Sequence, residues 1–145
     1  MNQSVRFYFN DVHITLKEKT RLKKFLLLLF KSEGCFVKNI NVVFCTDSYL
    51  LDINTAFLKH DYFTDIVTFS YSNQKKFIDG ELYISAERIR ENSQMHKTSL
   101  KEELHRVIFH GCLHLCGYRD KTSQEIKKMR ERENYYLRLY HIKRS

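Results

Sequence analysis

The run HGCLHLCGYRD, residues 110–120, constrains the fold and chemistry of this 145-residue chain more than any other segment. His110 and His114 are four residues apart, and on an α-helix this spacing places both imidazoles on one face, about 6 Å apart at Cβ. Gly117 can end the helix by adopting a positive φ, and Asp120 can then turn back toward the imidazoles. Two imidazoles, one carboxylate and a fourth position open to water are typical of catalytic zinc, whereas structural zinc usually has four protein ligands.

Other interpretations of this run stay open. A bare pair of histidines at this spacing also occurs on helices that bind no metal. The pattern H-x-x-x-H-x-x-G-x-x-D matches the spacing of the metzincin proteases, in which a glutamate follows the first histidine and acts as the general base. Gly111 occupies that position here and argues against peptide hydrolysis by that mechanism. The predicted ligands His110, His114 and Asp120 suit zinc, with nickel or manganese as weaker candidates.

The same run resembles the signature of the YbeY-type endoribonucleases, which are metal-dependent enzymes of bacterial ribosomal RNA maturation. The family pattern is H-G-x-L-H-L-x-G-Y-D-H; Asp120 stands in place of its last histidine, and Arg119 in place of the preceding aspartate. Upstream, residues 64–69 (TDIVTF) resemble the family's T-D-V-L-S-F, and residues 80–85 (GELYIS) resemble its G-D-I-x-I-S.

This resemblance implies a mixed sheet with helices packed on it and the site helix central. It also implies a single-strand-specific, metal-dependent endoribonuclease that acts on the 3′ end of small-subunit ribosomal RNA and in ribosome quality control. The implied partners are ribosomal RNA and the small ribosomal subunit or its proteins, and no DNA substrate is expected.

Catalytic residues other than the metal ligands stay unassigned, with two weak candidates. The family carries a functional arginine where this chain has Leu58, and Lys59 is the adjacent cation that could contact a phosphate. The alternative for Lys59 is a solvated loop lysine. Glu81 could orient a metal ligand from behind, or could simply cover one face of the sheet.

Positive charge is concentrated in two stretches of a chain whose formal net charge is +8. Residues 17–31 hold six basic residues and one acidic residue, and residues 121–145 hold eight basic and three acidic residues. Solvated helix faces would account for most of these charges. Alternatively, they form a surface that binds RNA phosphates, with an affinity that falls as salt rises.

No stretch of about 18 apolar residues predicts a membrane span, and the N-terminus lacks the layout of a signal peptide. We therefore expect a cytoplasmic protein whose four cysteines are reduced thiols. Cys112 and Cys116 alternate with the histidines, but each lies about 200° around the helix from His114. They are therefore predicted to be core residues, not metal ligands.

Hydrophobic periodicity predicts an α+β fold with about four strands and five helices, in a single domain over residues 1–145. The predicted strands are residues 5–9, 37–45, 65–71 and 77–84, the last two as a hairpin. The predicted helices are residues 17–31, a helix capped by Asp47 and reaching Phe57, residues 86–94 capped by Ser85, a site helix from Ser99 to Gly117, and a last helix from Thr122. The buried stripe of the last helix is predicted to be Ile126, Met129, Leu137 and Tyr140.

The favoured function is a zinc-dependent endoribonuclease that uses a metal-activated water. One alternative is a metalloprotease-like hydrolase, which Gly111 opposes. The other is a non-enzymatic ribosome-binding factor, in which a structural metal fastens the helix to the following turn. Removal of the metal distinguishes this binding factor from an enzyme, because a structural metal supports folding whereas a catalytic metal supports mainly activity.

Overall fold

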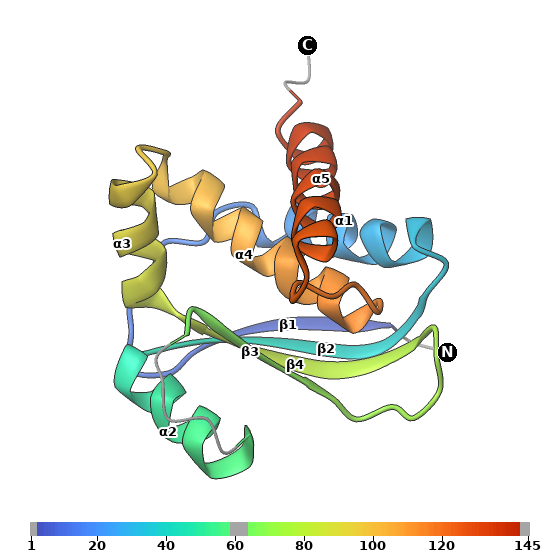
Figure 1. Cartoon of the computed structure of the whole chain (residues 1–145), viewed down its shortest axis with the longest axis horizontal. Helices are drawn as coiled ribbons and strands as arrows, with labels where there is room; N and C mark the ends of the chain where they lie inside the picture. The colour runs from blue at the N-terminus through green and yellow to red at the C-terminus, as the bar shows by residue number, and fades with distance from the viewer. Residues whose placement is uncertain (1–2, 59–63, 143–145) are drawn as a thin grey trace.

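The computed structural model describes residues 3–58 and 64–142, and Lys59 lies outside these ranges. Over the described residues it confirms an α+β fold with one four-stranded mixed sheet and five helices (Figure 1). The strands are β1 (Ser4–Phe9), β2 (Phe36–Cys45), β3 (Ile66–Ser70) and β4 (Phe77–Ser85). The helices are α1 (Lys19–Ser32), α2 (Asp47–Leu58), α3 (Ala86–Met95), α4 (Leu100–Leu115) and α5 (Ser123–Tyr140). None of these described helices is both long and apolar enough to cross a membrane.

The sheet has the strand order β1-β2-β4-β3. β1 pairs with β2 and β2 with β4 in parallel, whereas β3 pairs with β4 in antiparallel, which confirms the predicted hairpin. Alternate residues of neighbouring strands form one apolar face: Val42 is level with Leu82, and Phe44 with Ile84, and all four are fully buried. Helices α1, α4 and α5 lie over this face, and α2 lies on the other (Figure 1).

The site helix α4 lies over the sheet and packs against β3, β4, α1, α3 and α5. Two glycines, one on α4 and one on β4, allow the helix to lie close to the sheet. A Cβ at Gly111 would be 2.6 Å from Cδ1 of Ile66, and a Cβ at Gly80 would be 2.6 Å from the carbonyl oxygen of Phe69 and about 3.1 Å from Leu115. The close approach of α4 to the sheet therefore depends on the absence of a side chain at Gly111 and at Gly80.

Helices α1, α4 and α5 meet in an aromatic cluster above the sheet. The ring centroid of Phe25 lies 5.3 Å from that of Phe109 and 4.8 Å from that of Tyr140. Cys112 is fully buried in this core and Cys116 is partly buried against it, which confirms that both pack as core residues. Close packing of these buried side chains fixes the position and orientation of α4.

Three predicted N-caps are confirmed by side-chain hydroxyls that accept a backbone hydrogen bond: Ser85, Ser99 and Thr122. The prediction for Asp47 was wrong. The hydroxyl of Thr46 accepts the hydrogen bond from the backbone N–H of Tyr49 at 3.0 Å, and Asp47 is already helical. Both residue types are good caps, so the local sequence did not decide between them.

Candidate metal centre

The side chains of His110, His114 and Asp120 converge at the C-terminal end of α4. That helix ends at Leu115, and Gly117, with φ of +107°, turns the chain so that Asp120 comes back beside the imidazoles. The Nε2 atoms of both histidines lie 3.2 Å from the same atom, Oδ2 of Asp120. The two rings are nearly perpendicular, with an interplanar angle of 83°.

These three atoms fit the ligand set of one metal ion. Ligand atoms about 2.0–2.1 Å from a tetrahedral ion are separated from each other by about 3.3 Å, close to the spacings found here. All the candidate ligand atoms lie within 4.8 Å of one another. The side chains are between 22% and 38% exposed, so an ion and a further ligand can enter from solvent.

The far side of the His110 ring is held by a buried carboxylate. Oε2 of Glu133, on α5, lies 2.6 Å from Nδ1 of His110. The other oxygen of Glu133 accepts a hydrogen bond from Arg106 at 2.9 Å, and Arg106 also donates to Asn134. Burial alone would lower the pKa of His110, but the hydrogen bond and the charge of Glu133 raise it overall.

The far side of the His114 ring is held by the main chain. Nδ1 of His114 lies 3.0 Å from the carbonyl oxygen of Tyr118, and the hydroxyl of Tyr118 donates to Glu33 at 2.7 Å. A carbonyl can only accept, so Nδ1 of His114 carries a proton. In the neutral form of the ring, which is the form that binds a metal, the lone pair of Nε2 then faces Asp120. A lone pair facing a carboxylate oxygen is unfavourable, and a cation between them makes it favourable.

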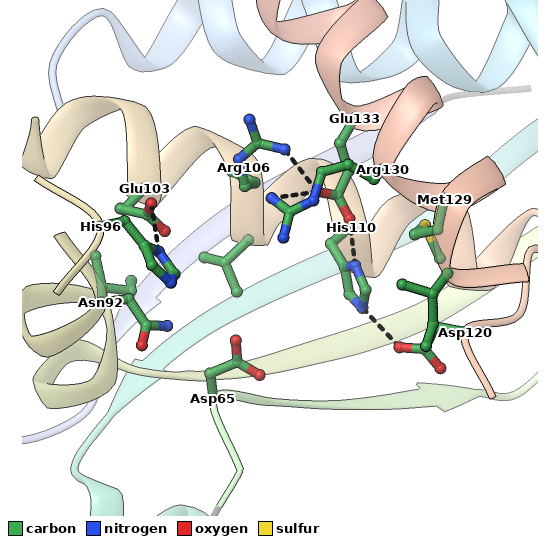
Figure 2. Close-up of a pocket in the computed structure, with 13 residues that line it drawn as sticks. Asp65, Asn92, His96, Glu103, Arg106, His110, Asp120, Met129, Arg130 and Glu133 are labelled. Atoms are coloured by element: carbon green, nitrogen blue, oxygen red, sulfur yellow. Dashed lines mark hydrogen bonds and ion pairs between the residues drawn. The ribbon is translucent and has the colours of Figure 1, made fainter. Parts of the chain in front are cut away.

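Two cavities flank the centre. One of about 320 Å³ lies between α3, α4 and α5, and one of about 210 Å³ lies on the side of β3 and α2. His110, Asp120 and Asp65 line both cavities, and Asp65 points into the larger one (Figure 2). Burial raises the pKa of the Asp65 carboxyl. A carboxyl group is therefore positioned at the boundary of the two spaces, beside His110.

Of the two weak candidates, only Glu81 lies within the described residues. Lys59 lies outside them. Glu81 lies on the other face of β4 from Leu82, and its carboxylate accepts hydrogen bonds from Tyr71 at 2.6 Å and Tyr83 at 3.2 Å. These contacts match the alternative interpretation, a residue that covers the outer face of the sheet. The carboxylate that orients an imidazole is instead Glu133, which no local sequence pattern indicates, because it lies 23 residues beyond His110.

A family profile described as "Endoribonuclease YbeY" matches residues 7–141. The chain belongs to this family. A protein named Endoribonuclease YbeY from Cytophaga hutchinsonii is 40% identical over 137 residues, which cover 94% of this chain and 96% of the relative. The protein of the same name from Flavobacterium psychrophilum is 40% identical over 135 residues, covering 93% and 96%.

Structural similarity agrees with the sequence relationship. The solution structure of a Thermotoga maritima protein aligns with a TM-score of 0.64 at 26% sequence identity, covering 94% of this chain and 88% of that one. Membership of the YbeY family confirms the resemblance carried by residues 110–120, in which Asp120 stands in place of the family's usual histidine.

Proposed function

We propose that this YbeY-family protein is a zinc-dependent, cytoplasmic endoribonuclease that cuts single-stranded RNA at the 3′ end of small-subunit ribosomal RNA. Family membership supports a metal-dependent endoribonuclease of ribosomal RNA maturation. The observation that carries the assignment is the convergence of both Nε2 atoms, of His110 and His114, on one oxygen of Asp120 at 3.2 Å. A role in ribosome quality control extends the same proposal.

A zinc ion bound there would lower the pKa of water from about 15.7 to near 7 and polarise a phosphoryl oxygen. The residues of the chain have separate tasks. Glu133 and the carbonyl of Tyr118 fix the directions of the imidazoles. Asp65, beside His110, is positioned to orient the attacking water or to take its proton.

Exposed cations support RNA as the partner, together with the small ribosomal subunit or its proteins. Lys24 and Lys31 of α1 and Lys127 and Lys128 of α5 are exposed to solvent. Exposed cations on these two helices can contact a phosphate backbone, and such binding weakens as salt rises.

Gly111 opposes the protease alternative for a structural reason as well. The missing side chain would point at Ile66 and Leu82, in the apolar contact between α4 and the sheet. A glutamate at this position would therefore place a charge in the core, away from the ligand side of the helix, at a high desolvation cost.

The test measures zinc content and RNA cleavage in parallel, on wild type, His114→Ala and His13→Ala. The substrate is a structured RNA with a single-stranded 3′ tail. We expect about one zinc per chain and cleavage of the tail in wild type, and loss of both in His114→Ala with an unchanged far-ultraviolet circular dichroism spectrum. His13 is exposed and is not one of the candidate ligands, so His13→Ala should match wild type. Wild type that holds metal but cuts only peptide, or cuts nothing, would contradict the proposal.

A further inference from the structure

The larger cavity beside His110 contains groups that the metal chemistry does not use. It has a volume of about 320 Å³ and extends from His110 and Asp120 to Asn92 and His96 at the far side (Figure 2). It therefore continues directly from the proposed metal centre toward α3. Its size lies at the lower end of small-molecule sites, which span about 300–1,000 Å³, so it suits one nucleoside and not a helical segment.

The lining of the cavity is apolar in the middle. Ile89, Val107 and Met129 are buried and line it from α3, α4 and α5. Ile126 also lines the cavity but is 51% exposed, so the prediction that it belongs to the buried stripe of α5 was wrong. Met129 is buried, as predicted. Apolar side chains contributed by three helices can pack against the flat faces of a nucleobase.

Two polar side chains, Asn92 and His96, stand at the α3 end. Nδ1 of His96 lies 3.2 Å from Oε1 of Glu103, and the same oxygen accepts a hydrogen bond from Thr98 at 2.9 Å. The ring of His96 is thus oriented, and its Nε2 does not take part in that contact. Within residues 3–58 and 64–142, the side-chain amide of Asn92 makes no hydrogen bond. An amide and an imidazole together offer the donors and acceptors that recognise the edge of a base.

An exposed cation stands at the α5 side. Arg130 is 57% exposed, and its Nη1 lies 3.7 Å from Glu133, which is longer than a hydrogen bond. Glu133 is already bonded to His110 and Arg106 at 2.6 and 2.9 Å. The guanidinium of Arg130 can therefore leave this carboxylate and bind a phosphate without exposing a buried charge.

We propose that this cavity binds one nucleoside of single-stranded RNA next to the cleaved phosphodiester. The base lies between Val107 and Met129, Asn92 and His96 contact its edge, and Arg130 binds the adjoining phosphate. Unpaired bases can turn outward into such a site, whereas bases stacked in a duplex cannot, so the cavity selects single strands. This inference rests on the endoribonuclease function proposed above.

The test couples a change in the enzyme to a change in the RNA. Asn92→Phe fills the cavity, and Gln94→Phe places the same side chain on the exposed side of α3 as the control. Each zinc-loaded protein cuts a single-stranded oligonucleotide and a series in which one nucleotide near the cut is abasic. We expect one abasic position to lower kcat/KM of wild type and Gln94→Phe by about tenfold or more. In Asn92→Phe, in which the cavity is filled, the same abasic substitution should leave kcat/KM unchanged.

A second arm does not need cleavage. Adenosine and uridine 5′-monophosphates, titrated into wild type, should shift the NMR signals of Asn92 and His96, and should not bind Asn92→Phe. If wild type cuts RNA but no abasic position distinguishes it from Asn92→Phe, the nucleoside site is overturned and the proposed function stands. If wild type neither cuts RNA nor binds either mononucleotide, both are overturned.

The phosphate contact has its own control pair. Arg130→Ala should raise KM for the oligonucleotide several-fold, and Arg138→Ala removes an equal charge from the same helix, two turns further on, without contact to the cavity. Equal effects of the two substitutions would overturn the contact with Arg130, because they would show only a general effect of charge.

Discussion

Oε2 of Glu133 lies 2.6 Å from Nδ1 of His110, and this contact joins α5 to the C-terminal half of α4. Glu133 is buried, and its pKa is lowered overall: burial alone would raise it, but the hydrogen bonds from His110 and Arg106 outweigh burial. An ionised Glu133 can only accept, so Nδ1 of His110 donates the proton and Nε2 faces Asp120. The orientation of one candidate ligand is therefore set by a helix outside the motif.

The first prediction concerns this carboxylate. Glu133→Gln keeps the size of the side chain but removes its charge, so the ring of His110 should be held less firmly and be less basic. We expect zinc affinity to fall about 10–100-fold, measured by competition with a chelator of known affinity. Glu131→Gln, at an exposed position of the same helix, is the control. Equal affinities in all three proteins would show that Glu133 does not support the ligand.

The second prediction concerns Asp65, which lines both cavities beside His110. Asp65→Asn cannot take a proton, and proton transfer by a positioned side chain contributes about 10²–10⁴-fold to a rate. We expect kcat to fall by at least about 10² while zinc content stays at the wild-type value. Asp52→Asn, on the exposed side of α2, should be fully active. A loss of zinc together with activity would instead make Asp65 part of the metal site.

The third prediction concerns the departure from the family pattern at Asp120. A carboxylate reduces the positive charge of a metal ion more than an imidazole does, so the ion acidifies water less. Asp120→His should retain zinc and move the pH optimum of RNA cleavage downward. The pH–rate profiles of wild type and Asp120→His provide the measurement. Superimposable profiles would count against this effect of the carboxylate.

The fourth prediction links Glu33 to stability and pH. Glu33 accepts hydrogen bonds from Tyr118, Tyr136 and Arg132. Burial alone would raise its pKa, but these bonds lower it below 4.5 overall. A carboxyl whose folded-state pKa lies below its unfolded-state value stabilises the fold above that value, and the contribution is lost as pH falls through the folded-state pKa.

Glu33→Gln should therefore lower the free energy of unfolding by about 1–3 kcal/mol at neutral pH. The difference from wild type should shrink as pH falls below 4.5, toward the lowered pKa of Glu33 in the folded state. Urea unfolding over that pH range measures both quantities. A difference that is independent of pH would show that Glu33 contributes by shape and not by charge.

The fifth prediction separates a catalytic from a structural metal. The C-terminal half of α4 is held by Ile108, Cys112 and Leu113, which are fully buried, and does not depend on the ligands for its packing. Chelation of zinc should therefore abolish RNA cleavage and leave the circular dichroism spectrum unchanged, with only a modest fall in Tm. Unfolding upon chelation would favour the ribosome-binding factor with a structural metal.

The local sequence was sufficient for the features that depend on neighbouring residues. The four-residue spacing of His110 and His114 requires a helix to bring them together, and Gly117 allows the positive φ that brings Asp120 back. The alternation of β3 and β4 and the hydroxyls at three caps specify their elements in the same way. Such features have short sequence separations, so each can be predicted without knowing the rest of the fold.

Only the tertiary structure decided how the centre is supported and what lies beside it. Glu133 reaches His110 from another helix, Glu33 holds Tyr118 from 85 residues away, and Glu81 lies on the outer face of the sheet. The cavity next to His110 exists because α3, α4 and α5 meet there without filling the space. Contacts between distant segments follow from the packing of whole helices and strands, and no periodic pattern within one segment records them.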